Sequence, residues 1–552
     1  MRFMAVCSMA MFVMACSEDP ETPDNPDDPN NGDIIEEPQP DKSPVELKSV
    51  VFYAADNSAY MSEDVAVEAV VEEKDGDMVV RIVGGGAGKE LTMTLTAGAN
   101  NIVTVDGAAV ECADTEGGVE GKVKFDATFP ADITVANQAG DTKKYVVKVG
   151  KVLETVVEQI ASYTEPDCTI SNCFLAVNPK DNTPYVAYTR KSATGSVDQG
   201  AVIKWNGTAF DAVGPLGFTS DAKKASLMSV TFDMNGVPYV IYYDATISGN
   251  VVKKLGAGSW EDVGAGLSKA SSSAPANLMF NPANNMPVVL FQGNDSTTGT
   301  RREMVRAEWN GSEWAETLAH LAPAVNGSAN VYTASQSVLV GDALYVAATY
   351  TTIGYFVYKF QNGTWTTIVD PTATPYYAGT TPHAGYVNIF ADAAGNVYVA
   401  GGSDAAKASS WDVQIWKLDE ANNTLLPYGP VAPVGFGTLR ETMSAGVNPV
   451  TGEVAAVYKD QDSDLVMYST INEDLQWNPF MPLNSMKGDN TALIHVKFCN
   501  DGVGYALFLV AEEYQKDEDG KTVKDENGNS IVTIPASLEL FRIGLEKDEL
   551  PE

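Results

Sequence analysis

The feature that most constrains how this chain can fold is a unit of about fifty residues that recurs seven times. Each copy begins with an apolar run, a turn rich in Asn, Asp, Gly or Pro, and a second apolar run, which is the pattern of a β-hairpin. The copies occupy residues 174–188, 227–242, 278–291, 338–348, 387–400, 443–458 and 493–509. A period of this length is typical of repeat architectures, so we expect the seven units to fold as one array.

A second hairpin follows the first in the earlier copies, and its turn glycines give the period directly. Gly207, Gly258, Gly311 and Gly363 are separated by 51, 53 and 52 residues. Two hairpins per unit predict a four-stranded antiparallel blade, and blades placed radially hide their sheet edges. We therefore predict an all-β fold with a seven-bladed β-propeller over residues 151–546 and a tail at 547–552. The seventh copy lacks a fourth strand, and we expect residues 155–162 to close the ring by pairing with the C-terminal strand.

The amino terminus has the pattern of an export signal. Arg2 is followed by an apolar run that ends in Val13-Met14-Ala15-Cys16. This run is too short to span a bilayer. This resembles the bacterial lipoprotein signal. The resemblance implies that residues 1–16 are the signal with its recognition site, and that Cys16 is acylated, including with palmitate, and becomes the first residue of the mature chain. The acidic Ser17-Glu18-Asp19 that follows resembles the export signal of Bacteroidota-type surface lipoproteins. The resemblance implies an outer-membrane lipoprotein exposed at the cell surface.

Two segments separate this signal from the repeats. Residues 17–44 are acidic and rich in proline with almost nothing to bury, which predicts an extended, solvated tether. Residues 45–150 contain short β-patterned runs separated by Gly and Asp turns, which predicts a β-sandwich. Its final segment, 139–149, resembles the last hairpin of the immunoglobulin-like modules in such lipoproteins, and that resemblance implies a spacer.

Composition excludes one class of ligand and leaves one covalent question open. The net charge of −37 argues against nucleic acid, because phosphate binding depends on clustered Lys and Arg. Four cysteines remain beyond the signal, at positions 112, 168, 173 and 499. Cys168 and Cys173 are close enough to bridge across a loop, or they are two buried thiols.

Candidate ligand-binding residues lie in the loops that join the second strand of a blade to the third, and the fourth to the next blade. These loops gather on one face of a propeller, where a rigid scaffold positions them. The candidates are Arg190, Asp244, Arg301, Tyr376, Tyr377, His383, Trp411, Arg440 and Lys459. Trp411 is expected in a loop as an aromatic platform, whereas the tryptophans beside the second hairpins are interpreted as packing between blades.

No cofactor or metal site is predicted. Only three histidines are present, and His495 falls in the first strand of the last repeat, where we expect a structural role. The alternating acids of residues 517–530 lack the glycine and glutamate positions of an EF-hand, so we interpret this stretch as a solvated hairpin insertion.

Three functions remain open from the sequence, one of which is a purely structural scaffold in a surface complex. The first is a non-enzymatic surface protein that presents the loop face to a glycan or a protein. The alternative is a carbohydrate-active enzyme, either a glycoside hydrolase or a polysaccharide lyase, although no catalytic signature recurs in the blades. We favour the binding protein, with the membrane as partner through the lipid and a glycan or surface protein as possible ligand.

Overall fold

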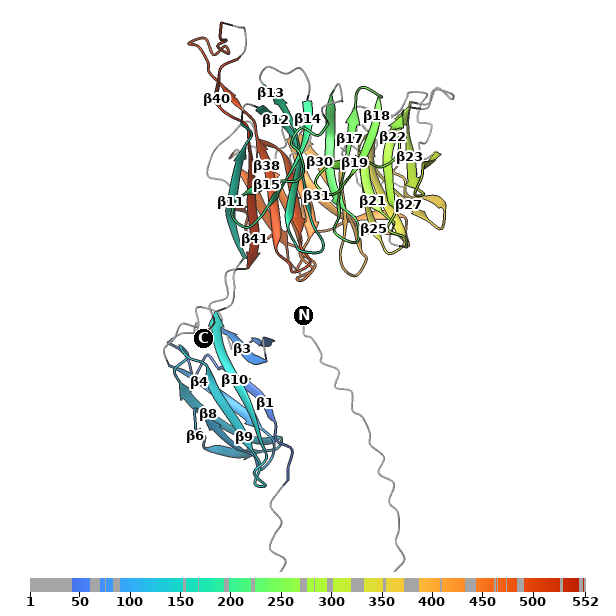
Figure 1. Cartoon of the computed structure of the whole chain (residues 1–552). Coiled ribbons are helices and arrows are strands. Elements are labelled where there is room, and N and C mark those ends of the chain that lie inside the picture. The colour runs from blue at the N-terminus through green and yellow to red at the C-terminus, as the bar shows by residue number, and fades with distance from the viewer. Residues whose placement is uncertain are drawn as a thin grey trace, which may run out of the picture. The chain divides into compact units, whose positions relative to one another are not determined.

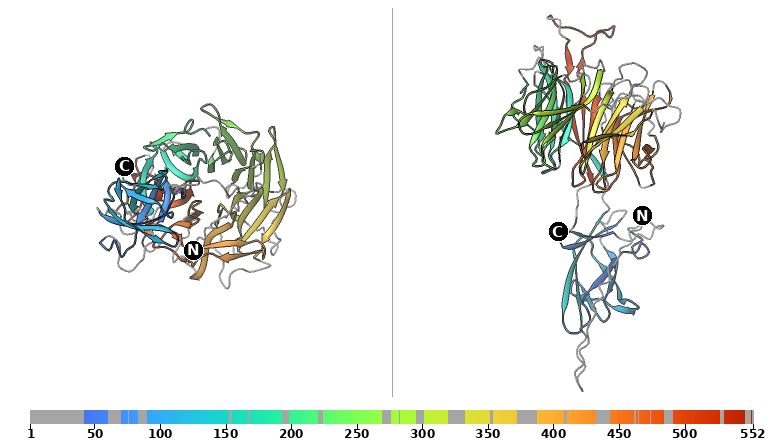
Figure 2. Two further views of the ribbon diagram at one scale, coloured as in Figure 1. Left: turned by 90° about the horizontal axis from the view of Figure 1, so that it is seen from below. Right: turned by 90° about the vertical axis from the view of Figure 1, so that its right-hand side faces the viewer.

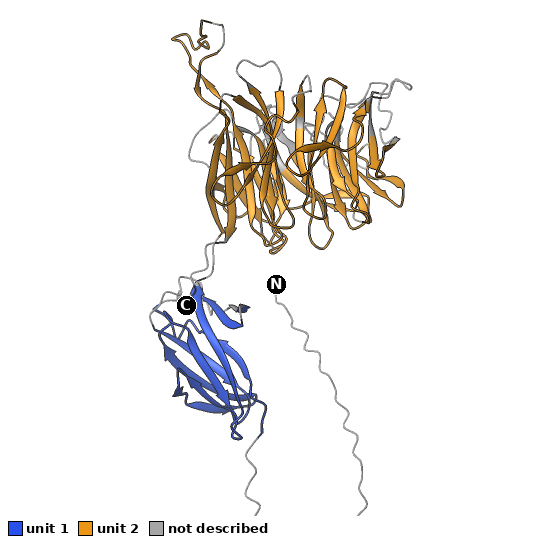
Figure 3. Cartoon of the chain, viewed as in Figure 1, with its two compact units in different colours: residues 1–152, 548–552 blue, residues 153–547 orange. Residues whose placement is uncertain are grey.

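The structure is a computed structural model of the chain. It describes residues 42–59, 70–74, 76–82, 90–151, 155–166, 168–192, 198–219, 224–268, 276–281, 283–294, 301–318, 332–350, 354–371, 387–407, 410–431, 443–460, 463, 465–472, 474–483, 491–526, 530–545 and 550. The chain divides into two compact units, 1–152 with 548–552 and 153–547 (Figure 3). The all-β prediction is confirmed, since every regular element in the described ranges is a strand, and none of those ranges forms a helix that could cross a bilayer.

The smaller unit consists of two sheets. The first has the order β1 (Leu47–Val51), β4 (Leu91–Ala97), β8 (Gly118–Phe125) and β7 (Cys112–Thr115). The second has the order β2 (Val70–Lys74), β3 (Asp77–Ile82), β10 (Thr142–Lys151), β9 (Ala131–Ala136), β5 (Ile102–Val105) and β6 (Ala108–Ala109). Within it β10 pairs with β3 in parallel and with β9 in antiparallel orientation.

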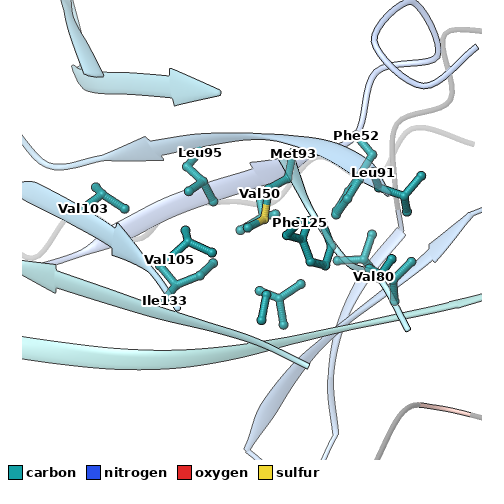
Figure 4. Close-up of a cluster of buried hydrophobic side chains, with 14 of the residues drawn as sticks. Val50, Phe52, Val80, Leu91, Met93, Leu95, Val103, Val105, Phe125 and Ile133 are labelled. Carbon is teal, nitrogen blue, oxygen red and sulfur yellow. The ribbon is translucent and has the colours of Figure 1, made fainter. Parts of the chain in front are cut away.

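One hydrophobic core holds these two sheets together. Alternate residues of β4, among them Leu91, Met93 and Leu95, are fully buried and meet Ile133 and Val103 of the second sheet (Figure 4). Alternation of this kind is what a strand with one buried face requires. The unit is therefore a two-layer β-structure whose core is independent of the repeats.

The larger unit is built chiefly from four-stranded antiparallel sheets (Figure 1), and in six of those described the strands follow chain order. The first three are β12 (Cys168–Val177), β13 (Pro184–Ser192), β14 (Asp198–Trp205), β15 (Phe210–Ala212); β16 (Ala225–Phe232), β17 (Pro238–Asp244), β18 (Gly249–Leu255), β19 (Trp260–Asp262), with β20 (Leu267–Ser268) added to β18; and β21 (Asn277–Phe280), β22 (Pro287–Asn294), β23 (Arg301–Trp309), β24 (Trp314–Leu318). The next three are β25 (Tyr332–Val340), β26 (Ala343–Tyr350), β27 (Gly354–Gln361), β28 (Thr364–Val369); β29 (Val387–Ala391), β30 (Val397–Lys407), β31 (Ser410–Asp419), β32 (Thr424–Pro427); and β33 (Met443–Val447), β34 (Val454–Lys459), β35 (Val466–Ile471), β36 (Met481–Pro482).

The last sheet joins the two ends of this unit. Its order is β37 (Thr491–Phe498), β38 (Gly504–Val510), β41 (Ser537–Leu545) and β11 (Thr155–Thr164), and β11 pairs with β41 along its whole length. The short strands β39 (Glu513–Tyr514) and β40 (Val532–Ile534) pair as a separate hairpin, so the hairpin insertion predicted around residues 517–530 is confirmed.

The sheets follow one another around a common axis (Figure 2, left). Their first strands are neighbours in cyclic order: β12, β16, β21, β25, β29, β33, β37 and again β12. This is the arrangement of β-propeller blades, in which each sheet packs face to face on the next and the first strands surround the axis.

Two local devices predicted from the sequence are present. The turn glycines Gly207 and Gly311 have φ of 98° and 100°, a conformation that side chains disfavour. The tryptophans of the outer strands connect neighbouring sheets, since Trp260 donates to the Val213 carbonyl at 3.1 Å and Trp314 to the Val263 carbonyl at 2.8 Å. Their interpretation as packing between blades is confirmed.

Candidate functional site

A tyrosine and a lysine face each other across the second and third strands in four of the sheets. The pairs are Tyr185 with Lys204, Tyr239 with Lys254, Tyr345 with Lys359, and Tyr398 with Lys417. The ammonium lies 5.2–5.8 Å from the ring centre in the last three pairs, within the range of a cation–π contact. The repeat therefore places a large ring and a cation at the same point of each of these sheets.

The tyrosine fills the space between its own sheet and the next. The ring of Tyr185 meets Phe232 at a centroid distance of 4.9 Å, and that of Tyr239 meets Phe280 at 4.8 Å, both edge to face. The phenylalanine in each case lies at the end of the following sheet's first strand. Aromatic pairs of this geometry seal the junction between adjacent sheets.

The junction between the β21–β24 sheet and the β25–β28 sheet lacks this seal. Val288 and Glu308 occupy the positions of the tyrosine and the lysine, and Leu339 lies where the two preceding junctions have phenylalanine. A pocket of about 330 Å³ opens at this point, lined by these three residues together with Met279, Phe280, Asn281, Arg306, Asp342, Leu344, Phe360, Asn362 and Gly363. The smaller side chains leave unfilled the volume that the aromatic pair occupies elsewhere.

Arg306 is a second departure from the repeat at the same junction. It faces Leu290 across the sheet, at the register position that Val202, Val252, Val357 and Ile415 hold in four other sheets. Those four residues are buried and apolar, with exposed fractions of 4% or less. A guanidinium therefore stands at a position where the fold otherwise places a core side chain.

The guanidinium is held from two sides and is incompletely hydrogen-bonded. Its carbon lies 3.8 Å from the ring centre of Phe360, and its Nη2 forms an ion pair with Glu308. The side chain is only 13% exposed, and its buried Nε has no acceptor among the described residues. Burial lowers the pKa of Arg306, and the attraction of Glu308 offsets only part of that shift. A buried donor without a partner is a group that a ligand oxygen can satisfy.

The rest of the lining supplies short polar groups on one side and apolar surface on the other. Asn281 and Asn362 belong to the two turns at the mouth, and Asp342 accepts from Gln361 at 2.9 Å. Met279 and Leu339 form the apolar side. A cavity of this size with few convergent polar groups over an apolar wall suits a small organic ligand.

The pocket opens at the opposite ends of the strands from the face that carries the sequence candidates. It is bounded by the turns that join the first strand to the second and the third to the fourth. Of the candidates, Arg190, Asp244 and Lys459 lie at the far ends of β13, β17 and β34, in three different sheets. The structure does not bring those three into the pocket.

Two of these candidates have local structural partners. Arg190 forms an ion pair with the buried Glu165 at 2.9 Å and donates to Cys168 Sγ at 3.1 Å. The Asp244 carboxylate accepts from the Thr246 amide at 2.6 Å within a turn. The Cys173 thiol donates to the Leu493 carbonyl, and no disulfide joins Cys168 to Cys173.

The structure describes only some of the remaining predicted positions. Cys16, Tyr376, Tyr377, His383 and Arg440 lie outside the described residues, and for Arg301 only the position in β23 is described. The expectation that Trp411 lies in a loop is wrong, because it is the second residue of β31. The pair β30–β31 extends outward as far as Lys407 and Ser410, so the strand begins earlier than the apolar pattern indicates.

Metal binding finds no support in the described ranges. Within them, no three His, Cys, Asp or Glu side chains come together as a group that could hold an ion. His495 lies in β37, where its Nε2 is 3.0 Å from the Cys173 carbonyl.

Arg306, Glu308 and Val288 were missed as site residues. Charges at alternate positions in Arg306-Ala307-Glu308 are typical of a solvent-facing strand, which conceals the burial of the guanidinium. The available signal was the comparison of one repeat with another, because Val288 replaces the tyrosine that follows Pro184 and Pro238 in earlier copies.

Comparisons with known proteins identify distant likenesses. No protein-family model and no curated protein matches the chain. Among solved structures, a protein of unknown function from Dyadobacter fermentans is 10% identical with a TM-score of 0.38, covering 70% of this chain and 99% of that one. AofleA from Arthrobotrys oligospora is 10% identical (TM-score 0.35, 60% and 90% covered), and an α-L-arabinanase from Penicillium chrysogenum is 9% identical (TM-score 0.36, 70% and 98% covered). These scores assign no function.

Proposed function

We propose that this chain is a non-enzymatic binding protein that recognises a neutral sugar unit in the Arg306 pocket. The observation that carries the proposal is the pocket itself, which exists because Val288 and Arg306 replace the tyrosine and the valine of the sister sheets. The orphaned Nε of Arg306 and the amides of Asn281 and Asn362 supply partners for hydroxyl groups. Met279 and Leu339 supply an apolar wall for a sugar's C–H face.

The charge balance of the lining favours a neutral ligand. Among the lining residues one guanidinium faces two carboxylates, Glu308 and Asp342. Glu308 is paired with Arg306, and Asp342 accepts from Gln361. An anionic ligand would meet the same two carboxylates at short range, where like charges repel.

The same arrangement favours binding over hydrolysis. A glycosidase needs one carboxyl group that donates a proton and a second that acts as base or nucleophile. In the pocket both carboxylates already have protein partners that fix them as hydrogen-bond acceptors. These are the properties of orienting groups, so we propose recognition without bond cleavage.

The cellular setting that we propose follows the resemblances in the sequence. Cys16 would carry the lipid, residues 17–44 would form the tether, and the two-layer unit would serve as an immunoglobulin-like spacer. The repeats would then form a seven-bladed propeller displayed at the outer membrane. Globomycin-sensitive processing and acyl labelling of the full chain test this anchor, and unchanged labelling of Cys16→Ser would contradict it.

The binding proposal is tested by refilling the pocket with the repeat's own side chain. Val288→Tyr restores the residue that seals the neighbouring junctions, and Arg306→Met removes the guanidinium. Lys254→Met is the matched control, because it removes a cation from the preceding sheet, at the register position that Glu308 holds in this one. The three variants and the parent, as full mature chains, are applied to an array of neutral glycans and then to the retained sugar by calorimetry.

We expect the parent and Lys254→Met to retain the same glycans, with affinity reduced at least tenfold in the two pocket variants. A tenfold loss corresponds to about 1.4 kcal/mol, less than one charge-assisted hydrogen bond. Equal retention by Val288→Tyr would contradict the pocket as the site. Release of shortened products from retained glycans would replace the binding proposal with the hydrolase alternative.

A further inference from the structure

A second cavity lies on the axis of the repeats. It has a volume of about 330 Å³, and its lining includes residues of β12, β16, β21, β25, β29, β33 and β37. Those are the first strands of the sheets, which are neighbours in cyclic order around the axis. The cavity differs from the Arg306 pocket, which lies between two sheets, and Met279 lines both.

The lining of this cavity combines apolar side chains with uncharged hydrogen-bonding groups. The hydrogen-bonding groups include Asn172, Asn277, Gln336, Asn388 and Ser444. Asn388 donates to Gln336 Oε1 at 2.7 Å and accepts from the Ala445 amide at 3.0 Å, which fixes the Gln336 oxygen as an acceptor.

The ionisable side chains in this lining are those of Lys497 and His495. They lie two residues apart on β37 and so face the same side. The His495 Nε2 is 3.0 Å from the Cys173 carbonyl, and the ring packs against Phe174 at 5.0 Å. Because a carbonyl oxygen can only accept, Nε2 is the donor in this contact.

The Lys497 ammonium is the uncompensated charge of the cavity. The described lining contains no carboxylate, and Lys497 forms no ion pair with any described residue. Burial lowers the pKa of Lys497, and burial together with the nearby Lys497 lowers that of His495 to about 4. A cation enclosed without a counter-charge costs free energy, which a bound anion would recover.

We propose that the axial cavity binds a small hydroxycarboxylate, with its carboxylate paired to Lys497 Nζ and its hydroxyl groups held by the surrounding amides. The single cation accounts for one negative charge on the ligand. The amide and hydroxyl groups of Asn172, Gln336 and Ser444 account for the ligand's remaining polar atoms. The protein has a net charge of −37, which repels anions in general. The positive charge of Lys497 would therefore be the local group that attracts a carboxylate into this cavity.

Calorimetry of the full mature chain tests this proposal with D-glucuronate, D-glucose and inorganic phosphate as probes. Glucuronate and glucose differ only in the carboxylate, so the pair isolates that group. We expect glucuronate to bind, glucose to bind at least tenfold more weakly, and Lys497→Met to weaken glucuronate by about 10- to 100-fold, the worth of one charge-assisted hydrogen bond. Lys497→Arg keeps the charge and should retain most of the affinity.

The controls separate this site from the other one. Lys417→Met removes a cation from a different sheet and should leave glucuronate binding unchanged, as should Val288→Tyr in the Arg306 pocket. Unaltered glucuronate binding by Lys497→Met would overturn the assignment, and so would tighter binding of phosphate than of glucuronate. Absence of glucuronate binding to the parent chain would also overturn it, whatever the neutral-glycan array shows.

Discussion

Arg306→Met should leave the protein as stable as the parent or more stable, although it breaks a buried ion pair. Arg306 stands at a core position of the repeat, with its side chain 13% exposed and its Nε without an acceptor in the described structure. Methionine keeps the unbranched stem and its contact with Phe360 while it removes the charge and the orphaned donor. The substitution therefore separates the cost of the guanidinium from the packing of its chain.

The magnitude follows from the separate contacts of the guanidinium. An unsatisfied buried donor costs about 1–3 kcal/mol, and this cost disappears in the variant. The ion pair is worth about 0–1 kcal/mol because Glu308 is 37% exposed and can be hydrated after the change. The contact with Phe360 contributes about 0.5–2 kcal/mol, of which a thioether recovers part. The expected change is a gain of about 0–1 kcal/mol in the free energy of unfolding.

Differential scanning calorimetry of the full mature chain measures this change as the shift in the transition of the larger unit. A gain of that size raises the midpoint by no more than about 2 °C in a unit of this length. Lys359→Met is the matched control, because Lys359 pairs with Glu420 at 2.7 Å and lies over Tyr345 at 5.2 Å. It should lower the midpoint slightly.

A drop of several degrees for Arg306→Met would refute this reasoning. Breaking a buried ion pair that supports the fold costs about 3–5 kcal/mol, because a charge is left without compensation. That result would make Arg306 and Glu308 a structural pair. The pocket would then be a by-product of packing, and the sugar-binding proposal would lose the observation on which it depends.

Three further outcomes follow from described contacts. Glu165→Gln should lower the free energy of unfolding by about 3 kcal/mol in thermal melts, because it leaves the guanidinium of Arg190 without its 2.9 Å partner. Trp314→Phe should cost about 1 kcal/mol in the same assay, since the half-buried Val263 carbonyl loses its donor. Burial holds the pKa of His495 at about 4, below its unfolded value near 6.5, so the unfolded state binds the extra proton between these values. Stability should therefore fall as pH drops from 6.5 towards 4, and His495→Gln should flatten that decline in melts across the range.

The blade pattern was predictable because it depends on local chemistry. Apolar alternation and positive-φ turn residues such as Gly207 and Gly311 repeat in every early copy, and each fixes a hairpin without knowledge of distant residues. The outer extension of β30 and β31 was not visible, since residues 403–409 are small or polar and carry no alternation. Backbone pairing between the two strands continues there without an apolar pattern, and Lys407 is in register with Ser410.

The pocket was not predictable from a single repeat. Its walls come from two sheets, and residues as far apart in sequence as Met279 and Phe360 line it. In isolation Arg306 and Glu308 look like exposed charges on an outward-facing strand. Only the register against Val202 of a sister sheet shows that the position is internal. The relevant information was present in the sequence, but it required alignment of strands across the repeats.

A closed ring of sheets can tolerate one junction that is packed less well than the others. Each sheet contacts chiefly its two neighbours, so a weakened junction costs the ring locally and leaves the other contacts intact. The junction next to Arg306 contains two of the buried donors that have no acceptor in the described structure, Arg306 Nε and Trp365 Nε1. Other tryptophans of this type, such as Trp314, donate to a carbonyl of the preceding sheet. Unmet donors gathered at one junction, beside a cavity that the two preceding junctions fill with an aromatic pair, are what the proposed recognition site requires, because such a site exchanges stability for binding.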